Sequence, residues 1–132
     1  MSNDQHVQRY LLDLSRKVEG IVLSLPEGVD GTVTVRENHV YIEIRGPRLE
    51  AFTLVLGSEA PEIVYDGQYI RYELIPEGME EQIDFAKETV DDITEFLLSD
   101  RNPVERKSRF LGRAYLSVPL AGDVEWRLKK FN

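Results

Sequence analysis

Carboxylates dominate the residues of this chain that could do chemistry, and they are concentrated in one stretch. Between residues 77 and 100, nine acids accompany one lysine, so this stretch carries about −8, equal to the net charge of the whole 132-residue chain. Paired carboxylates act as general acid and base when their surroundings separate their pKa values. Helical spacing instead places seven of them on a water-facing side, where nothing raises a pKa. The predicted acidic face consists of Glu80, Glu81, Asp84, Glu88, Asp91, Asp92 and Glu95.

The residue sets that other catalytic or metal sites require are missing from the sequence. There is no cysteine, and the two histidines, His6 and His39, are predicted at a helix start and a hairpin tip, so we expect no metal site. No serine stands in a Gly-x-Ser-x-Gly elbow, and no glycine-rich phosphate loop is present. Asp66 and Glu73 flank a strand as in a magnesium nuclease, but no lysine follows the glutamate at the needed position. These gaps favour a protein that is not an enzyme and uses no cofactor.

The acidic face has two interpretations. In the first, it is the solvated side of an amphipathic helix, paired in part with basic residues of the same molecule. In the second, a row of carboxylates several turns long imitates a phosphate backbone or meets a basic protein, whose association it would accelerate in a salt-dependent way.

A basic segment follows the acidic stretch. Residues 101–132 carry about +5, from eight bases less three acids. The segment either neutralises the end of the acidic helix or contacts a small anion or a nucleic acid. The net charge of −8 argues against nucleic acid as the main partner. The candidate anion-binding residues are Arg101, Arg106, Lys107, Arg109 and Arg113.

The acidic stretch is predicted to be a helix because its apolar residues recur at spacings of four and three, which forms a single stripe. A second stripe predicts an N-terminal helix that starts at a capping box, Ser2 to Gln5, and is closed by Pro26. Gly20 either ends this helix near Glu19 or costs about 1 kcal/mol within it. The stripe of the acidic helix consists of Met79, Ile83, Ala86, Val90, Ile93 and Leu97.

Between residues 31 and 75 the apolar period changes to two, which predicts strands. A loop at Glu37-Asn38 with an even number of residues would place five aliphatic residues on one face. At Asp66-Gly67 we predict a two-residue loop that sets Ile63 opposite Ile70 and Glu62 opposite Arg71. Residues 49–56 predict a further strand between them, and strands within 110–120 and 124–129 follow the acidic helix. The five aliphatic residues are Val33, Val35, Val40, Ile42 and Ile44.

The predicted architecture is a single α+β domain over residues 1–132. A mostly antiparallel sheet of five to seven strands carries the N-terminal helix and the long amphipathic helix on one face. This order of elements resembles, in outline, the small acidic secretion chaperones of bacterial type III systems, although their closing helix is missing here. The resemblance rests on element order alone and implies a fold, not an activity.

We expect a non-enzymatic, cytoplasmic protein-binding module of the inhibitor, immunity-protein or secretion-chaperone kind. It would use the acidic face and an adjacent sheet surface, and its partner would be another protein, in the simplest case a basic one. No signal peptide or membrane-spanning apolar run is visible, so no membrane association is expected. The alternative is a ligand-binding or enzymatic domain with a pocket between the sheet and the long helix. A homodimer formed through Leu12, Leu23 or the last strand remains a third hypothesis.

Overall fold

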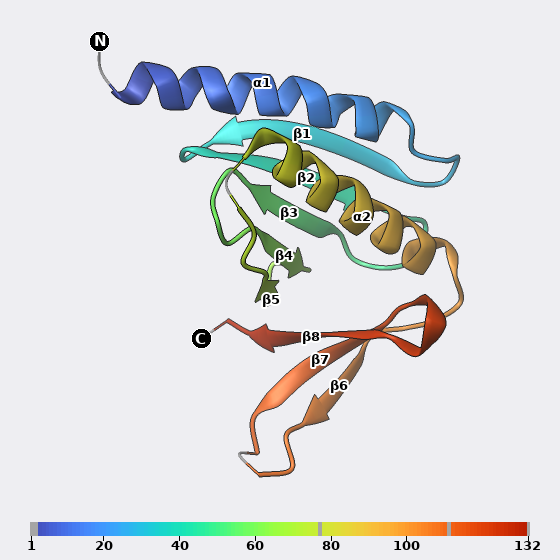
Figure 1. The fold of residues 1–132 in the computed structure, drawn as a ribbon. Coiled ribbons are helices and arrows are strands. Elements are labelled where there is room, and N and C mark those ends of the chain that lie inside the picture. Colours follow the sequence, from blue (N-terminus) through green and yellow to red (C-terminus); the bar gives the residue numbers. More distant parts are fainter. Residues whose placement is uncertain (1–2, 77, 111, 132) are drawn as a thin grey trace.

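A computed structural model describes residues 3–76, 78–110 and 112–131, which form two α-helices and eight strands (Figure 1). The predicted α+β class is confirmed, and the strand count is one above the predicted range. The additional strand, β6, lies in the basic segment. In chain order the elements are α1 (Asn3–Leu23), β1 (Asp30–Arg36), β2 (His39–Arg45), β3 (Phe52–Leu56), β4 (Glu62–Tyr65), β5 (Tyr69–Tyr72), α2 (Met79–Leu98), β6 (Val104–Lys107), β7 (Ala114–Pro119), a short 3-10 helix η1 (Ala121–Asp123) and β8 (Glu125–Lys130).

All eight strands belong to one antiparallel sheet in the order β1-β2-β3-β4-β5-β8-β7-β6. The chain leaves the sheet at β5, passes through α2 and returns at β6, so the last three strands are added in reverse order. β8 joins the two parts through two residue pairs, Tyr69 with Lys130 and Ile70 with Lys129. Strand β8 pairs with β7 over residues 125–129 and with β5 at residues 129 and 130, so the outermost strands of the described sheet are β1 and β6.

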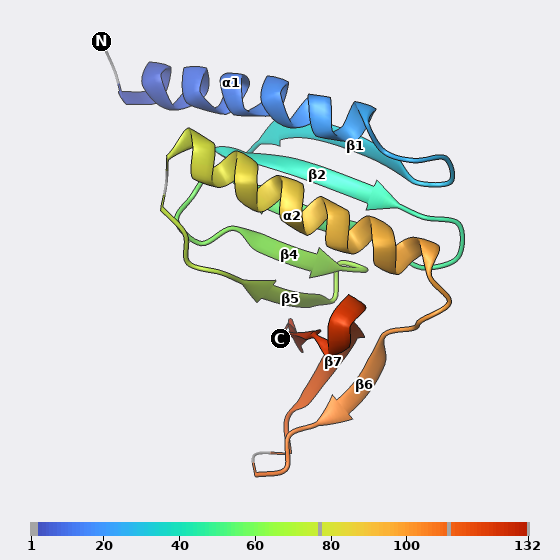
Figure 2. The same cartoon turned by 45° about the vertical axis from the view of Figure 1, so that its right-hand side comes forward.

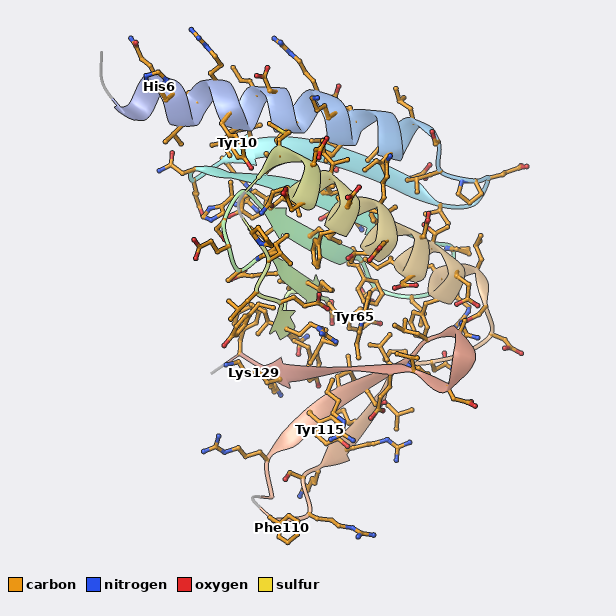
Figure 3. The ribbon with its side chains drawn as sticks, viewed as in Figure 1. His6, Tyr10, Tyr65, Phe110, Tyr115 and Lys129 are labelled. Carbon is orange, nitrogen blue, oxygen red and sulfur yellow. The ribbon has the colours of Figure 1, made fainter. Side chains whose placement is uncertain are left out.

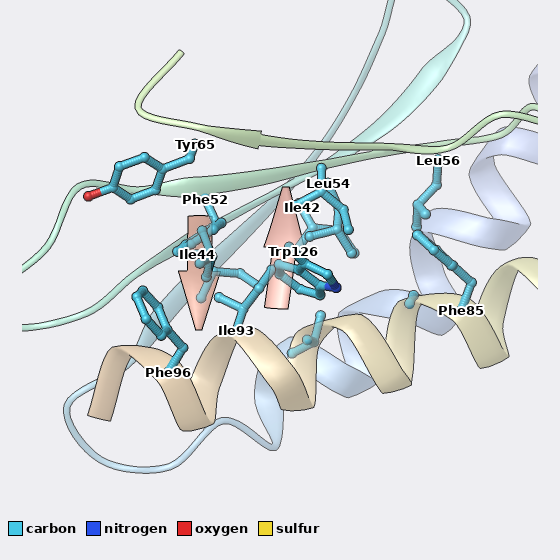
Figure 4. Packing of buried hydrophobic residues seen from close by; sticks show 14 of the residues in the cluster. Ile42, Ile44, Phe52, Leu54, Leu56, Tyr65, Phe85, Ile93, Phe96 and Trp126 are labelled. Carbon is cyan, nitrogen blue, oxygen red and sulfur yellow. The ribbon is translucent and has the colours of Figure 1, made fainter. Parts of the chain in front are cut away.

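Both helices cover the same face of the sheet, as predicted, with α1 over β1 and α2 beside it over β2 and β3 (Figures 1 and 2). Strand β2 alternates between buried and half-buried residues, which is the pattern of a sheet covered on one side. The inward residues meet apolar side chains of both helices in one core (Figure 4). Residues with no exposed surface in this core include Leu14, Val18, Ile42, Ile44, Phe52, Leu54, Ile93 and Phe96.

The Glu37-Asn38 hairpin has the predicted register. Both loop residues adopt positive φ, 51° and 61°, and Arg36 lies opposite His39. Val33 is therefore opposite Ile42 and Val35 is opposite Val40, so the five aliphatic residues share the helix-covered face. The two-residue loop fixes the register because a shift of one residue would move all of them to the other face.

The predicted register of the Asp66-Gly67 hairpin is wrong by one residue. Asp66 and Gly67 form the turn with φ of 55° and 65°, and the Gln68 N–H donates to the Tyr65 carbonyl at 3.0 Å. Gln68 is then an additional loop residue whose carbonyl accepts the Phe131 N–H at 2.8 Å. Strand β5 consequently begins at Tyr69, with Ile63 opposite Arg71, Val64 opposite Ile70 and Glu62 opposite Tyr72.

Both helices are close to their predicted extents. Helix α1 continues past Gly20 to Leu23, and a Cβ at Gly20 would meet nothing within 4 Å, so the helix carries this glycine on an open side. Ser2 of the predicted capping box lies outside the described residues. In α2 four residues of the predicted stripe are buried, whereas Met79 and Ile83 are half-buried. The buried face is broader than predicted and also includes Gln82, Phe85, Thr89 and Phe96.

Candidate interaction surfaces

The seven carboxylates of the predicted acidic face, Glu80 to Glu95, are all exposed along α2. They lie there because the opposite side of the helix is fixed by the core. Within the described part of the chain, Glu95 is the member of this set that forms an ion pair, with Arg101. The remaining six carboxylates have no ion-pair partner among the described residues, and Lys87 is the one cation within α2.

The expectation that nothing raises a carboxylate pKa on this side of the helix is wrong at Asp92. Its pKa is raised above the usual value, first because the carboxyl group is partly desolvated and then because Asp91, Glu88, Glu95 and Glu73 are nearby. Glu73 follows β5, so this flank of α2 faces the β5 side of the sheet. The repulsion means that a cation placed here would be attracted by several carboxylates at once.

The start of α2 is positioned by a buried glutamine, Gln82, which was not among the residues predicted from the sequence. Gln82 has no exposed surface, and its amide accepts the Gly57 N–H at 3.0 Å and donates to the Ser58 carbonyl at 2.8 Å. These bonds fasten the first turns of α2 to the loop after β3. The signal was present in the sequence, because position 82 falls within the apolar stripe, three residues after Met79 and four before Ala86.

The structure divides the five predicted anion-binding residues into two groups. Arg101 lies at the end of α2 and bonds to Glu95, which fits the interpretation that it neutralises an acid of the helix. Arg106, Lys107, Arg109 and Arg113 lie instead on or beside the β6–β7 hairpin, which projects from the helix-covered part (Figures 1 and 3).

The C-terminal end of α2 is held by Arg48, which no sequence pattern indicates as important. The Arg48 guanidinium donates to the Ser99 carbonyl at 2.6 and 3.0 Å, to the Asn102 Oδ1 at 2.7 Å and to the Arg101 carbonyl. A cation is favourable at this end of a helix because of the unpaired carbonyl groups and the dipole. Arg48 is thus a structural residue.

The outer face of the sheet, opposite α1 and α2, is not covered by a helix of the described chain. Tyr41, Val64, Ile70, Tyr72 and Tyr115 alternate onto this face from strands β2 to β7. The Arg36 guanidinium carbon lies 4.0 Å from the centre of the Tyr41 ring, and Tyr72 is 55% exposed. By contrast, Tyr65 and Tyr69 point inward and are buried, so they do not contribute to the outer face.

The space between α2 and the sheet is filled by side chains. The Phe52 ring centre lies 4.8 Å from that of Tyr65, 6.0 Å from that of Phe96 and 6.5 Å from that of Trp126 (Figure 4). Phe52, Ile93 and Phe96 have no exposed surface. The hydrophobic centre of the domain thus occupies the position at which the alternative hypothesis predicts a pocket.

Histidines and carboxylates do not converge into a metal site within residues 3–76, 78–110 and 112–131. His6 is exposed, and the Nδ1 of His39 lies 2.8 Å from the Glu37 carbonyl oxygen in the hairpin turn. Neither α1 nor α2, over its described residues, combines the length and the hydropathy needed to cross a membrane.

Comparisons of this chain with protein-family models, with curated proteins and with solved structures give no significant match.

Proposed function

We propose that this protein is a non-enzymatic, cytoplasmic protein-binding module that recognises a basic partner through the acidic face of α2. The observation that carries the proposal is the row of exposed carboxylates, six of the seven without an ion-pair partner in the described structure, on a helix whose other side is fixed in the core. A rigid, preformed helix face costs little ordering on binding.

The raised pKa of Asp92 supports this proposal in part, because repulsion by neighbouring carboxylates adds to desolvation, which is its first cause. A basic partner would relieve that repulsion and would be steered toward α2 from solution. Such steering mainly accelerates association and makes it sensitive to salt. The packed space beneath α2 favours this hypothesis over a ligand-binding or enzymatic domain with a pocket at that position.

The test replaces Asp84, Glu88 and Asp91 by their amides in one variant, D84N/E88Q/D91N. Glu95 is retained because its loss would leave Arg101 without its partner. The native cell extract is offered to wild-type and variant baits, and association of each captured basic protein is measured at low and high salt. We expect slower association and a smaller salt effect for the variant, with an unchanged thermal midpoint.

A matched control, E19Q/E27Q/E59Q, removes three exposed carboxylates outside α2 and changes the net charge equally. Partners of the acidic face should bind this control as they bind the wild type. If the α2 variant captures the same proteins at the same rates, the proposed function is wrong.

A further inference from the structure

A second charged surface, of positive sign, lies on the C-terminal arm, which we define as β6, β7, β8 and their connections. The arm carries exposed cations on its strands and on the β6–β7 loop: Arg106, Lys107, Arg109, Arg113, Arg127 and Lys129. Sequence patterns left two interpretations of this basic region, neutralisation of the end of the acidic helix or contact with a small anion or a nucleic acid. In the structure they lie on an extension of the sheet beyond the two helices (Figures 1 and 3).

Two of the acids in the arm are already engaged within the molecule. The Glu105 carboxylate accepts a hydrogen bond from the Tyr69 hydroxyl, and the Glu125 carboxylate accepts bonds from the Ser117 hydroxyl and, at 2.8 Å, from the Arg127 Nε. Of the six cations above, Arg127 is the one with an ion pair among the described residues. The others remain available to an external anion.

Aromatic side chains accompany these cations. Across three neighbouring strands, Arg106 pairs with Tyr115 and Tyr115 pairs with Lys129, so a ring lies between two cations on the outer face. The Arg127 guanidinium carbon is 5.1 Å from the centre of the Tyr115 ring. At the end of the hairpin, Phe110 is 95% exposed (Figure 3).

A groove of about 810 Å³ crosses the outer face beside this row and is lined in part by Ile70, Tyr72, Arg113, Lys129 and Phe131. Tyr72 is 55% and Phe131 47% exposed. Glu62 is the acid in the lining, so the charge of the groove is predominantly positive. A ligand in this groove would meet aromatic rings and cations together.

The net charge of −8 does not exclude an anionic ligand here, because the charges are separated in space. Helix α2 packs over β2 and β3, whereas Lys129 projects from the opposite side of the sheet on β8. β8 is three strand spacings from β3, or about 14 Å. The screening length is about 8 Å at physiological ionic strength, so carboxylates above β2 and β3 act weakly on β8, whereas the Asp92 flank of α2, near Glu73, lies closer.

We propose that the outer face of the C-terminal arm binds single-stranded nucleic acid, with Arg106 and Lys129 at phosphates and Tyr72 stacked on a base. The cations alone would bind either phosphates or an acidic polypeptide. The exposed aromatic rings favour nucleic acid, because every base has a flat face that can stack on a ring. This surface is distinct from the acidic face of α2, so the two proposals stand or fall separately.

The experiment measures fluorescence anisotropy of a labelled oligothymidylate and an oligouridylate of about twelve nucleotides, within the usual range of site sizes for such proteins. If four phosphates are contacted, raising the salt from about 50 to about 200 mM should weaken binding roughly fiftyfold. The variant R106Q/K129Q should weaken binding and make the logarithmic salt slope shallower by about 1.4. Tyr72→Thr should weaken binding about five- to 150-fold through lost stacking.

The matched control R9Q/K17Q removes two exposed cations from α1 and should bind the oligonucleotides like the wild type. The proposal is overturned if no binding occurs at the lower salt concentration or if the control loses as much affinity as R106Q/K129Q. It is also overturned if Tyr72→Thr has no effect while an oligoglutamate competes equally well, which would assign the surface to an acidic polypeptide.

Discussion

The helix-covered part of the sheet and the C-terminal arm use the same antiparallel hydrogen bonding but differ in burial. In β2 the inward residues Val40, Ile42 and Ile44 have no exposed surface. In β6, at the far edge of the arm, all four residues are exposed. Backbone pairing alone therefore extends the sheet at β6, whereas β7 and β8 still contribute buried residues such as Val118 and Leu128 to the core.

The arm is attached through few but specific contacts. Besides the two residue pairs between β5 and β8, the Phe131 N–H donates to Gln68 and the Tyr69 hydroxyl bonds to Glu105. Trp126 and Leu128 bury the inner face of β8 against the core. We therefore expect the outer strands of the arm to open at a lower free energy than β2 and β3.

The largest predicted effect comes from Phe52→Ala in the covered part. Phe52 has no exposed surface and its ring neighbours Tyr65, Phe96 and Trp126, so truncation should lower the free energy of unfolding by about 3–5 kcal/mol. Urea unfolding followed by the fluorescence of Trp126, the single tryptophan, measures the loss. A loss below about 1 kcal/mol would contradict the idea that this core carries the stability.

Gln82→Leu should have the next largest effect. The substitution removes both hydrogen bonds and leaves the Gly57 N–H and the Ser58 carbonyl without partners, which should cost about 2–3 kcal/mol. Gln68→Leu, at an exposed glutamine in the β4–β5 loop, serves as the control and should change the free energy of unfolding by less than about 0.5 kcal/mol. If Gln82→Leu and Gln68→Leu lowered the free energy of unfolding equally in the same urea titration, the buried hydrogen bonds of Gln82 would not contribute the predicted stability.

Tyr69→Phe tests one of the contacts between the covered part and the arm, the hydrogen bond to Glu105, and it should cost about 1 kcal/mol at neutral pH. The pKa of Tyr69 is raised above 10.0, first by its hydrogen bond to the Glu105 carboxylate and then by desolvation. The neutral phenol is thus favoured in the folded state, and its contribution is complete below the unfolded pKa and is lost as the pH rises through the folded pKa. Tyr69→Phe should therefore lose less stability than the wild type between about pH 9 and pH 11.

The matching measurement is urea unfolding of both proteins over that pH range. The relevant quantity is the difference between the wild type and Tyr69→Phe in the stability lost at alkaline pH. The pKa values of Tyr41 and Tyr65 are also raised, but both residues are present in both proteins and so do not affect this difference. Identical alkaline losses would show that the Tyr69–Glu105 bond does not hold the arm.

The smallest effect is expected at the tip of the arm. Phe110 is 95% exposed, so Phe110→Ser should change the free energy of unfolding by less than about 0.5 kcal/mol. The thermal midpoint provides the measurement. A decrease corresponding to more than about 1 kcal/mol would mean that the tip packs against the body in solution, and the contrast between the two parts would then be smaller than described.

Sequence patterns predicted the covered part well because its apolar residues recur with the period of the helix or strand and are the residues that become buried. The α2 stripe and the Glu37-Asn38 hairpin are local patterns, and both are confirmed with small differences. The Asp66-Gly67 register could not be predicted, because the carbonyl of Gln68 meets Phe131, sixty-three residues later in the chain. The pairing of β5 with β8 likewise joins segments that lie far apart in the chain, so local sequence patterns did not predict it.

The candidate surfaces were predicted to a different degree. Exposure of the seven α2 carboxylates followed from the helix period and required no tertiary information. The basic residues are divided between Arg101, at the end of α2, and the cations of the arm. This division depends on the order of the strands in the sheet, which a single sequence does not reveal. Gln82 was recognisable as a polar residue in an apolar stripe, but its partners were not.

The order in which the strands are translated has a consequence for the nascent protein. β5 is complete at Tyr72 but its neighbour β8 begins at Glu125, fifty-three residues later, so a ribosome working at about 5–20 residues per second supplies it roughly 3–10 s afterwards. During that interval β5 is an unprotected sheet edge that contains two tyrosines and an isoleucine. Premature pairing with another newly made chain is the characteristic error that this topology invites, and slower translation of residues 73–124 should increase it.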